Sequence, residues 1–125
     1  MKKSNNNLFT LEFLEPGEYI GRINSYNMAT TTDGATKFLN IYIILESEDF
    51  EEEVEICKAY ITNLGRNVRL KHFLEETGLL QRENQVDFNE LIGIYVTFSI
   101  EYDENGKMNV SDLEEYIDFA DTEDD

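Results

Sequence analysis

The clearest structural signal in the chain reads Phe38-Leu39-Asn40-Ile41-Tyr42-Ile43-Ile44-Leu45-Glu46. Its side chains fall into two rows with a period of two, which is the spacing of a β-strand. The aliphatic row and the mixed aromatic, polar and aliphatic row both suit a pleated sheet, because β-branched and aromatic residues are enriched in strands. The stretch therefore predicts a strand with one face in the core. The core row is Leu39, Ile41, Ile43 and Leu45, and the other row is Phe38, Asn40, Tyr42 and Ile44.

Further strands are predicted on both sides of this one. Residues 18–28, 54–61, 94–102 and 107–110 read as strands, with hairpin-type turns at Asp33-Gly34 and Asn105-Gly106. Gly21 inside the first strand indicates a bulge or a bend. In residues 94–102, we expect Ile94, Val96, Phe98, Ile100 and Tyr102 to point inward.

One helix interrupts the series of strands. Residues 67–77 show helical periodicity, Asn63 can cap the start, and Gly78 follows the end. Shorter helical turns are expected at residues 87–92 and 113–117. The order favours a mainly β protein, a five-stranded oligonucleotide-binding-type barrel with one α-helix between strands three and four. An open sheet or sandwich packed by one helix is the competing architecture.

The charge of the chain is strongly negative and unevenly distributed. It has 27 acidic and 10 basic residues among 125, a net charge of −17. Residues 46–55 carry seven acids and no base, and residues 101–125 carry eleven acids against Lys107 alone. Nonspecific nucleic-acid binders usually present a basic surface. Either the acidity is segregated from a binding face, or the partner is not nucleic acid.

Length and composition indicate a single domain. We interpret residues 1–14 as an N-terminal arm, 15–111 as the barrel and 112–125 as an acidic C-terminal tail. Cys57 is the only cysteine, so no internal disulfide can form, and we expect a cytoplasmic protein without a membrane segment. We expect Cys57 to be a buried, unreactive strand residue. The sequence indicates no oligomeric state.

Four segments together resemble a family of small phage- and mobile-element-encoded proteins that are regarded as single-stranded-DNA-binding-like. They are residues 16–23 (PGEYIGRI), 37–46 (KFLNIYIILE), 64–74 (LGRNVRLKHFL) and 91–98 (LIGIYVTF). The resemblance covers roughly residues 15–111. It implies a barrel fold and a role near replication or recombination intermediates.

Single-strand binding on such a barrel needs aromatic faces for base stacking and positive charge along the backbone path. The alternative is that the tyrosines merely cover the barrel with their hydroxyls in water. The candidate nucleic-acid-binding residues are Arg22, Tyr26, Lys37, Tyr42, Lys58, Tyr60 and Tyr95.

The acidic tail has an aromatic residue inside it. Such tails recruit partner enzymes in single-strand-binding proteins, so replication or recombination proteins are candidate partners; a plain solubility tail is the alternative. The candidate tail residues are Asp118, Phe119, Asp121, Glu123, Asp124 and Asp125.

The motifs of catalysis are missing from the sequence, and we expect neither an enzyme, a cofactor nor a metal site. The residues 103–106 lack the ligand spacing of a calcium loop and read as a turn. A second hypothesis is an acidic protein-interaction module, a mimic of DNA that binds a basic protein surface. The two hypotheses differ in whether basic and aromatic residues such as Arg22, Tyr42 and Lys58 converge on one face.

Overall fold

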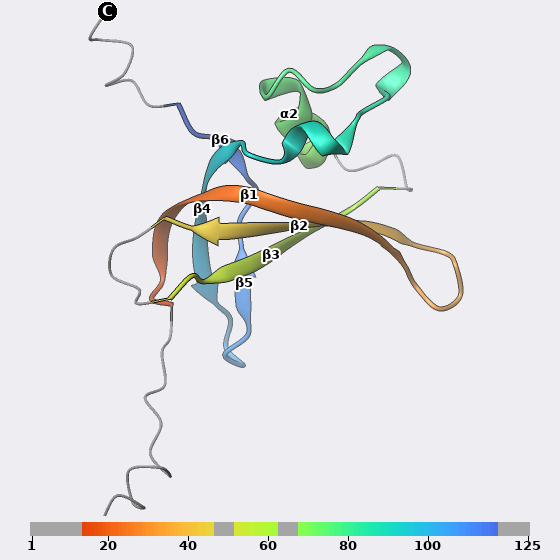
Figure 1. Ribbon diagram of the computed structural model, residues 1–125. Helices are drawn as coiled ribbons and strands as arrows, with labels where there is room; N and C mark the ends of the chain where they lie inside the picture. The colour runs from red at the N-terminus through yellow and green to blue at the C-terminus, as the bar shows by residue number, and fades with distance from the viewer. Residues whose placement is uncertain (1–13, 47–51, 63–67, 118–125) are drawn as a thin grey trace, which may run out of the picture.

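The computed structural model describes residues 14–46, 52–62 and 68–117, and its regular structure is mainly β, as the sequence predicts (Figure 1). One α-helix, α2, lies between the third and fourth strands, where it was expected. Two short 3₁₀ turns, η1 and η2, follow it. The elements are β1 (Gly17–Thr30), β2 (Lys37–Leu45), β3 (Glu55–Ile61), α2 (Val68–Glu76), η1 (Arg82–Asn84), η2 (Phe88–Leu91), β4 (Tyr95–Tyr102), β5 (Met108–Val110) and β6 (Glu114–Glu115).

The strands form one antiparallel sheet in the order β3-β2-β1-β4-β5, with β6 paired to β4. The first half of β1 pairs with β4, whereas the second half pairs with β2. Both partners meet β1 at Gly21, where an added Cβ would collide with the side chain of Ile43 and lie 2.9 Å from the carbonyl oxygen of Ile44. The bend predicted at this glycine therefore serves a close backbone approach. A register shift follows between Ile23 and Ser25.

Within the described residues the sheet is not closed by backbone pairing, because β3 and β5 stand at the two ends of the strand path. Two side chains nevertheless connect these ends. Lys58 Nζ donates to the carbonyl oxygen of Val110 at 2.8 Å, and the Leu113 N–H donates to the Tyr60 hydroxyl at 2.9 Å. Residues 110–113 therefore run alongside β3 in the same direction.

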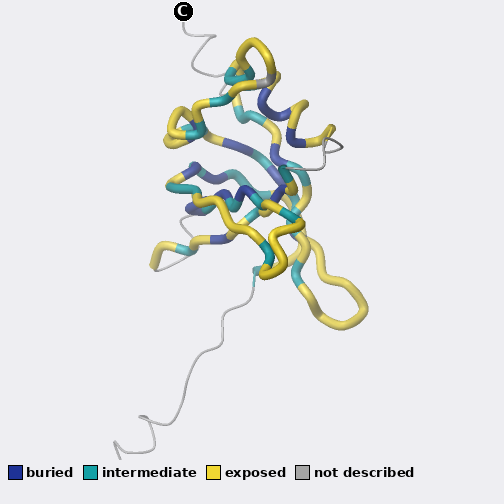
Figure 2. Tube along the Cα trace, turned by 90° about the vertical axis from the view of Figure 1, so that its right-hand side faces the viewer, coloured by how far each residue is buried: buried dark blue, intermediate teal, exposed yellow. Residues whose placement is uncertain are grey.

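The core lies between the sheet and α2. On β2 the predicted aliphatic row is buried, and on β4 the inward positions Val96, Phe98 and Ile100 are buried as expected. Figure 2 shows the buried residues gathered within the strands and the helix. We call the core-facing side of the sheet the inner face and the opposite side the outer face. The helix contributes Leu70, Phe73 and Leu74.

The sequence located the helix end and the turns correctly. After α2 the N–H of Leu79 donates to the carbonyl oxygen of Leu74, and Gly78 takes a φ of 77°. That left-handed geometry is the reason for a glycine after the helix. Both predicted hairpin turns are present, each with a positive-φ glycine. The expected cap Asn63 lies outside the described residues.

Two local expectations were wrong. The helical turn predicted at 113–117 is instead an extended segment containing β6, because its backbone donors find tertiary partners: Glu115 N–H bonds Glu76 Oε1, and Tyr116 N–H bonds the carbonyl oxygen of Tyr95. Tyr102, expected inward, is 38% exposed at the end of β4. Leu113, assigned to the tail from sequence, is 3% exposed and packs in the core, whereas Ile117 is 51% exposed.

Candidate nucleic-acid interface

Three of the seven predicted nucleic-acid-binding residues share the outer face. Arg22 stands directly opposite Tyr95 on β4 and opposite Ile44 on β2, and Tyr42 lies two positions from Ile44. Directly paired residues of antiparallel strands point to the same side of a sheet. Tyr95 is 40% exposed, while Arg22 and Tyr42 are half-buried. These three side chains therefore form one candidate surface.

Polar side chains on neighbouring strands hold Tyr42 in place. The Asn27 amide donates to the Tyr42 hydroxyl at 3.2 Å, and the Asn40 amide donates to Asn27 Oδ1 at 2.9 Å. Asn40 and Phe38 continue the outer row of β2 toward the β1–β2 turn. The outer face thus offers aromatic rings beside amides.

Few acidic residues lie within the strands that form this surface. The strands β1, β2, β3 and β4 contain only Glu18, Glu55 and Glu101 as acids, although the chain has 27. All three stand at or next to strand ends. Two carboxylates nevertheless border this surface. Glu55 stands opposite Ile44, the residue that pairs with Arg22, and Glu114 stands opposite Thr97, two positions from Tyr95.

Lys58 and Tyr60 lie on the inner face, since their partners on β2 are Ile41 and Leu39. Tyr60 is 3% exposed and its hydroxyl is occupied by the Leu113 N–H, so it cannot stack on a base and leaves the candidate set. Burial raises the pKa of Tyr60 to about 12.

Lys58 is occupied by contacts within the protein. Its Nζ donates to the Val110 carbonyl, lies 3.7 Å from Asp112 Oδ1 and stands 5.2 Å from the centre of the Tyr60 ring. Burial lowers the pKa of Lys58, and the Asp112 carboxylate opposes that shift. Its side chain is 17% exposed. Lys58 therefore connects β3 to β5. It lies on the opposite face of the sheet from Arg22 and Tyr42.

Tyr26 and Lys37 lie in the rows of the inner face, toward the far end of the β1–β2 hairpin. The Tyr26 hydroxyl donates to Asn89 Oδ1 at 3.0 Å, and its ring packs on Phe88 with a centroid distance of 5.8 Å. Lys37 is exposed at the start of β2, where its partner is Thr30. Neither residue adjoins the outer-face set.

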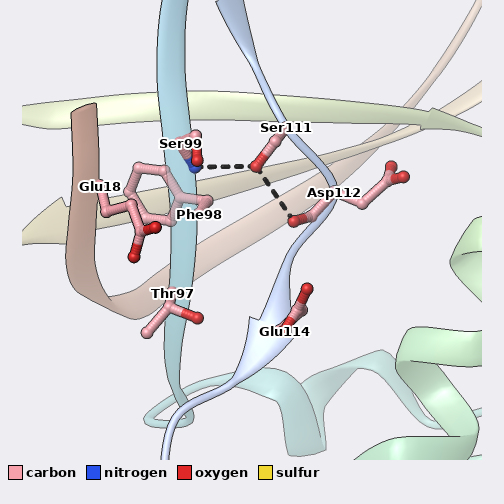
Figure 3. A pocket seen from close by; sticks show the side chains of 7 residues that line it. All are labelled: Glu18, Thr97, Phe98, Ser99, Ser111, Asp112 and Glu114. Carbon is pink, nitrogen blue, oxygen red and sulfur yellow. Dashed lines mark hydrogen bonds between the residues drawn. The ribbon is translucent and has the colours of Figure 1, made fainter. Parts of the chain in front are cut away.

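A small acidic hollow lies beside β4 (Figure 3). It has a volume of about 140 Å³ and contains three carboxylates, those of Glu18, Asp112 and Glu114. The Ser111 hydroxyl receives the Ser99 N–H at 2.7 Å on its wall. Sequence reasoning missed this hollow, because Glu18 is far from Asp112 and Glu114 along the chain.

Other candidate chemistry is spread out. Cys57 is exposed on β3, contrary to the expectation of a buried residue, because it occupies the outer row beside Tyr42. Burial of its sulfur and the nearby Glu55 raise the pKa of the Cys57 thiol. Across the described residues, no three His, Cys, Asp or Glu side chains form a group that could hold a metal ion, and no helix could span a bilayer. The candidate tail residues from Asp118 onward lie outside the described residues.

Comparison with known proteins does not extend this picture. No protein-family model, curated protein or solved structure matches the chain. The functional argument therefore rests on the residues themselves.

Proposed function

We propose that this protein binds single-stranded DNA on the outer face of its sheet, as an accessory protein of replication or recombination in a phage or mobile element. The observation that carries the proposal is the shared face of Arg22, Tyr42 and Tyr95, which Glu55 and Glu114 border. The proposal includes a five-stranded barrel of oligonucleotide-binding type. The approach of β3 and β5 through Lys58 and Tyr60 supports it, because these are the strands that closure would join.

Binding would combine stacking with one positive charge. Tyr95 and Tyr42 would stack bases, which contributes about 1–3 kcal/mol per base. Arg22, between them, would contact a phosphate as a planar donor. With a single arginine on the face, we expect weak affinity and a shallow dependence on salt compared with a basic single-strand binder.

Fluorescence anisotropy with a labelled strand of about 30 nucleotides, long enough for several sites of the size one such barrel covers, tests the proposal. Tyr95→Ala and Tyr42→Ala should each weaken binding about 5- to 150-fold, the equivalent of one lost stack. Arg22→Ala should also lower affinity and reduce the salt dependence. Tyr102→Ala is the matched control for Tyr95, because its side chain is similarly exposed but lies outside the face.

The outcomes separate the two main hypotheses. Saturable binding that is lost in the Tyr95 and Tyr42 variants and kept in the Tyr102 variant supports the outer face. No binding by the full chain at low salt, or equal losses in all three variants, rejects it. The proposal also places the protein in the cytoplasm, in keeping with its single cysteine.

A second function is favoured by a different observation. The hollow with Glu18, Asp112 and Glu114 presents three carboxylates on a chain of net charge −17. Such a field speeds association with basic partners. Replacing Glu18 and Glu114 with Gln should weaken capture by a basic protein if this acidic surface is the binding site. The same pair of substitutions should leave or improve strand binding.

A further inference from the structure

The edge of β3 that faces away from β2 carries backbone groups that no other described strand pairs. β3 is the last strand of the path, so among the described strands only β2 pairs with it. Beyond its end, Thr62 N–H donates to the carbonyl oxygen of Lys37 at 2.9 Å. In an antiparallel pair, residues that bond their partner alternate with residues whose N–H and C=O point away. Counting back from Thr62, the N–H and C=O groups of Glu55, Cys57 and Ala59 point away from β2.

Only side chains connect this edge to residues 110–113, which run alongside it. Lys58 bonds the Val110 carbonyl and Tyr60 receives the Leu113 N–H, but β3 and β5 share no backbone ladder. An arriving strand would therefore compete with two side-chain bonds and not with a row of backbone bonds. Edges of this kind accept extended segments from other chains.

The side chains and charges at this edge define what would fit. Cys57 and Ala59 are small and exposed, so they leave room for a neighbouring backbone. The start of β3 is strongly acidic, with Glu52, Glu53 and Glu55 all exposed. Lys58, the one base in β3, is turned inward. The edge is thus complementary to an extended segment with basic residues at one end.

We propose that the edge of β3 binds an extended, basic segment of a partner protein, which adds antiparallel to β3 and pairs with the backbone of Glu55, Cys57 and Ala59. In this orientation the C-terminal end of the segment lies beside the acidic start of β3. Backbone hydrogen bonds supply the affinity, and the acids select a segment with lysine or arginine at that end. Arg22 and Tyr95 lie on β1 and β4, away from this edge, whereas Tyr42 pairs with Cys57. The Arg22 and Tyr95 variants therefore test strand binding separately from the peptide.

The probe is a labelled synthetic peptide of alternating Thr and Val followed by three Lys, titrated into the full chain at low salt. We expect saturable binding and slowed hydrogen exchange at the amides of Cys57 and Ala59. The same peptide with its alternate amides N-methylated keeps its charge and loses its donors, so its binding should fall at least 10-fold. A peptide with three Glu in place of Lys should bind more weakly than either.

Ala59→Pro is the decisive variant, because proline removes one of the three N–H groups that face this edge and leaves the β2 ladder intact. It should weaken peptide binding about 2- to 10-fold, the equivalent of one hydrogen bond. Ala59→Val is the matched control and should bind as the natural chain does. Glu55→Lys should weaken peptide binding at least about 3-fold, because it reverses a charge beside the lysines of the peptide. The Glu55 side chain is exposed, so this variant tests the proposal even if Ala59→Pro does not fold.

Three results would overturn the proposal. The first is no binding of the lysine peptide at low salt. The second is equal binding of the N-methylated and ordinary peptides, which would indicate charge attraction without strand pairing. The third is unchanged exchange at Cys57 and Ala59 when the peptide is saturating.

Discussion

The bond between Tyr60 and Leu113 joins β3 to the segment that follows β5, and its removal gives a measurable loss. In Tyr60→Phe the ring keeps its place among buried residues, but the Leu113 N–H loses its acceptor at 2.9 Å. An unpaired buried donor costs about 1–3 kcal/mol. We therefore expect urea unfolding at pH 7 to show a loss of that size in the free energy of unfolding.

The same hydroxyl makes stability depend on pH. Burial raises the pKa of Tyr60 from 10.0 to about 12, so the folded state keeps its proton where the unfolded state loses it. This contribution to stability is present in full below pH 10 and is lost as the pH rises through 12. Two pKa units correspond to about 2.7 kcal/mol. Unfolding measured across this range should show the loss in the natural chain and not in Tyr60→Phe.

Tyr102→Phe is the control for these measurements, because the Tyr102 hydroxyl is exposed and bonds the carbonyl oxygen of Leu14 at the surface. It should change stability by less than about 0.5 kcal/mol. If Tyr60→Phe costs no more than Tyr102→Phe, and the two share one pH profile, the hydroxyl of Tyr60 does not tie the C-terminal segment to β3.

Three further predictions concern other parts of the molecule. Gly21→Ala should destabilise the fold by about 1–3 kcal/mol in urea unfolding, because its Cβ would collide with Ile43; a change under 0.5 kcal/mol would contradict the close approach. Asp112→Asn should lower the pKa of Lys58 further, because the Asp112 carboxylate raises that pKa in the natural chain. NMR of the lysine side chain measures the change. An unchanged or higher pKa would show that Asp112 does not act on Lys58. A chain ending at Ile117 loses the five acids of residues 118–125 and should therefore bind single-stranded DNA more tightly at low salt. The gain should vanish at high salt, and the melting temperature should stay unchanged. Weaker binding would reject a tail that competes with DNA.

The candidate site was predictable only in part. A period of two correctly places Tyr42 and Tyr95 on the side of their strands that faces away from the core. The same periodicity does not predict which row of an edge strand faces the core when both rows contain polar side chains. In β3, Lys58 and Tyr60 read as surface candidates, yet the ladder with Ile41 and Leu39 turns them inward. Their polar ends are accommodated by Val110 and Leu113, which sequence spacing does not bring near.

The sequence by itself determined the local structure of this protein: the strands, the helix with its glycine end, the hairpin turns and the buried row of β2. These depend on periodicity and on residues such as Gly78 and Gly106, whose backbone preferences act within a few positions. Tertiary structure alone decided the pairing of residues 114–115 with β4, the inward turn of Lys58 and the unpaired edge of β3. Those features arise where donors and acceptors distant in the chain meet, and a buried polar group takes whichever partner the packing brings within reach.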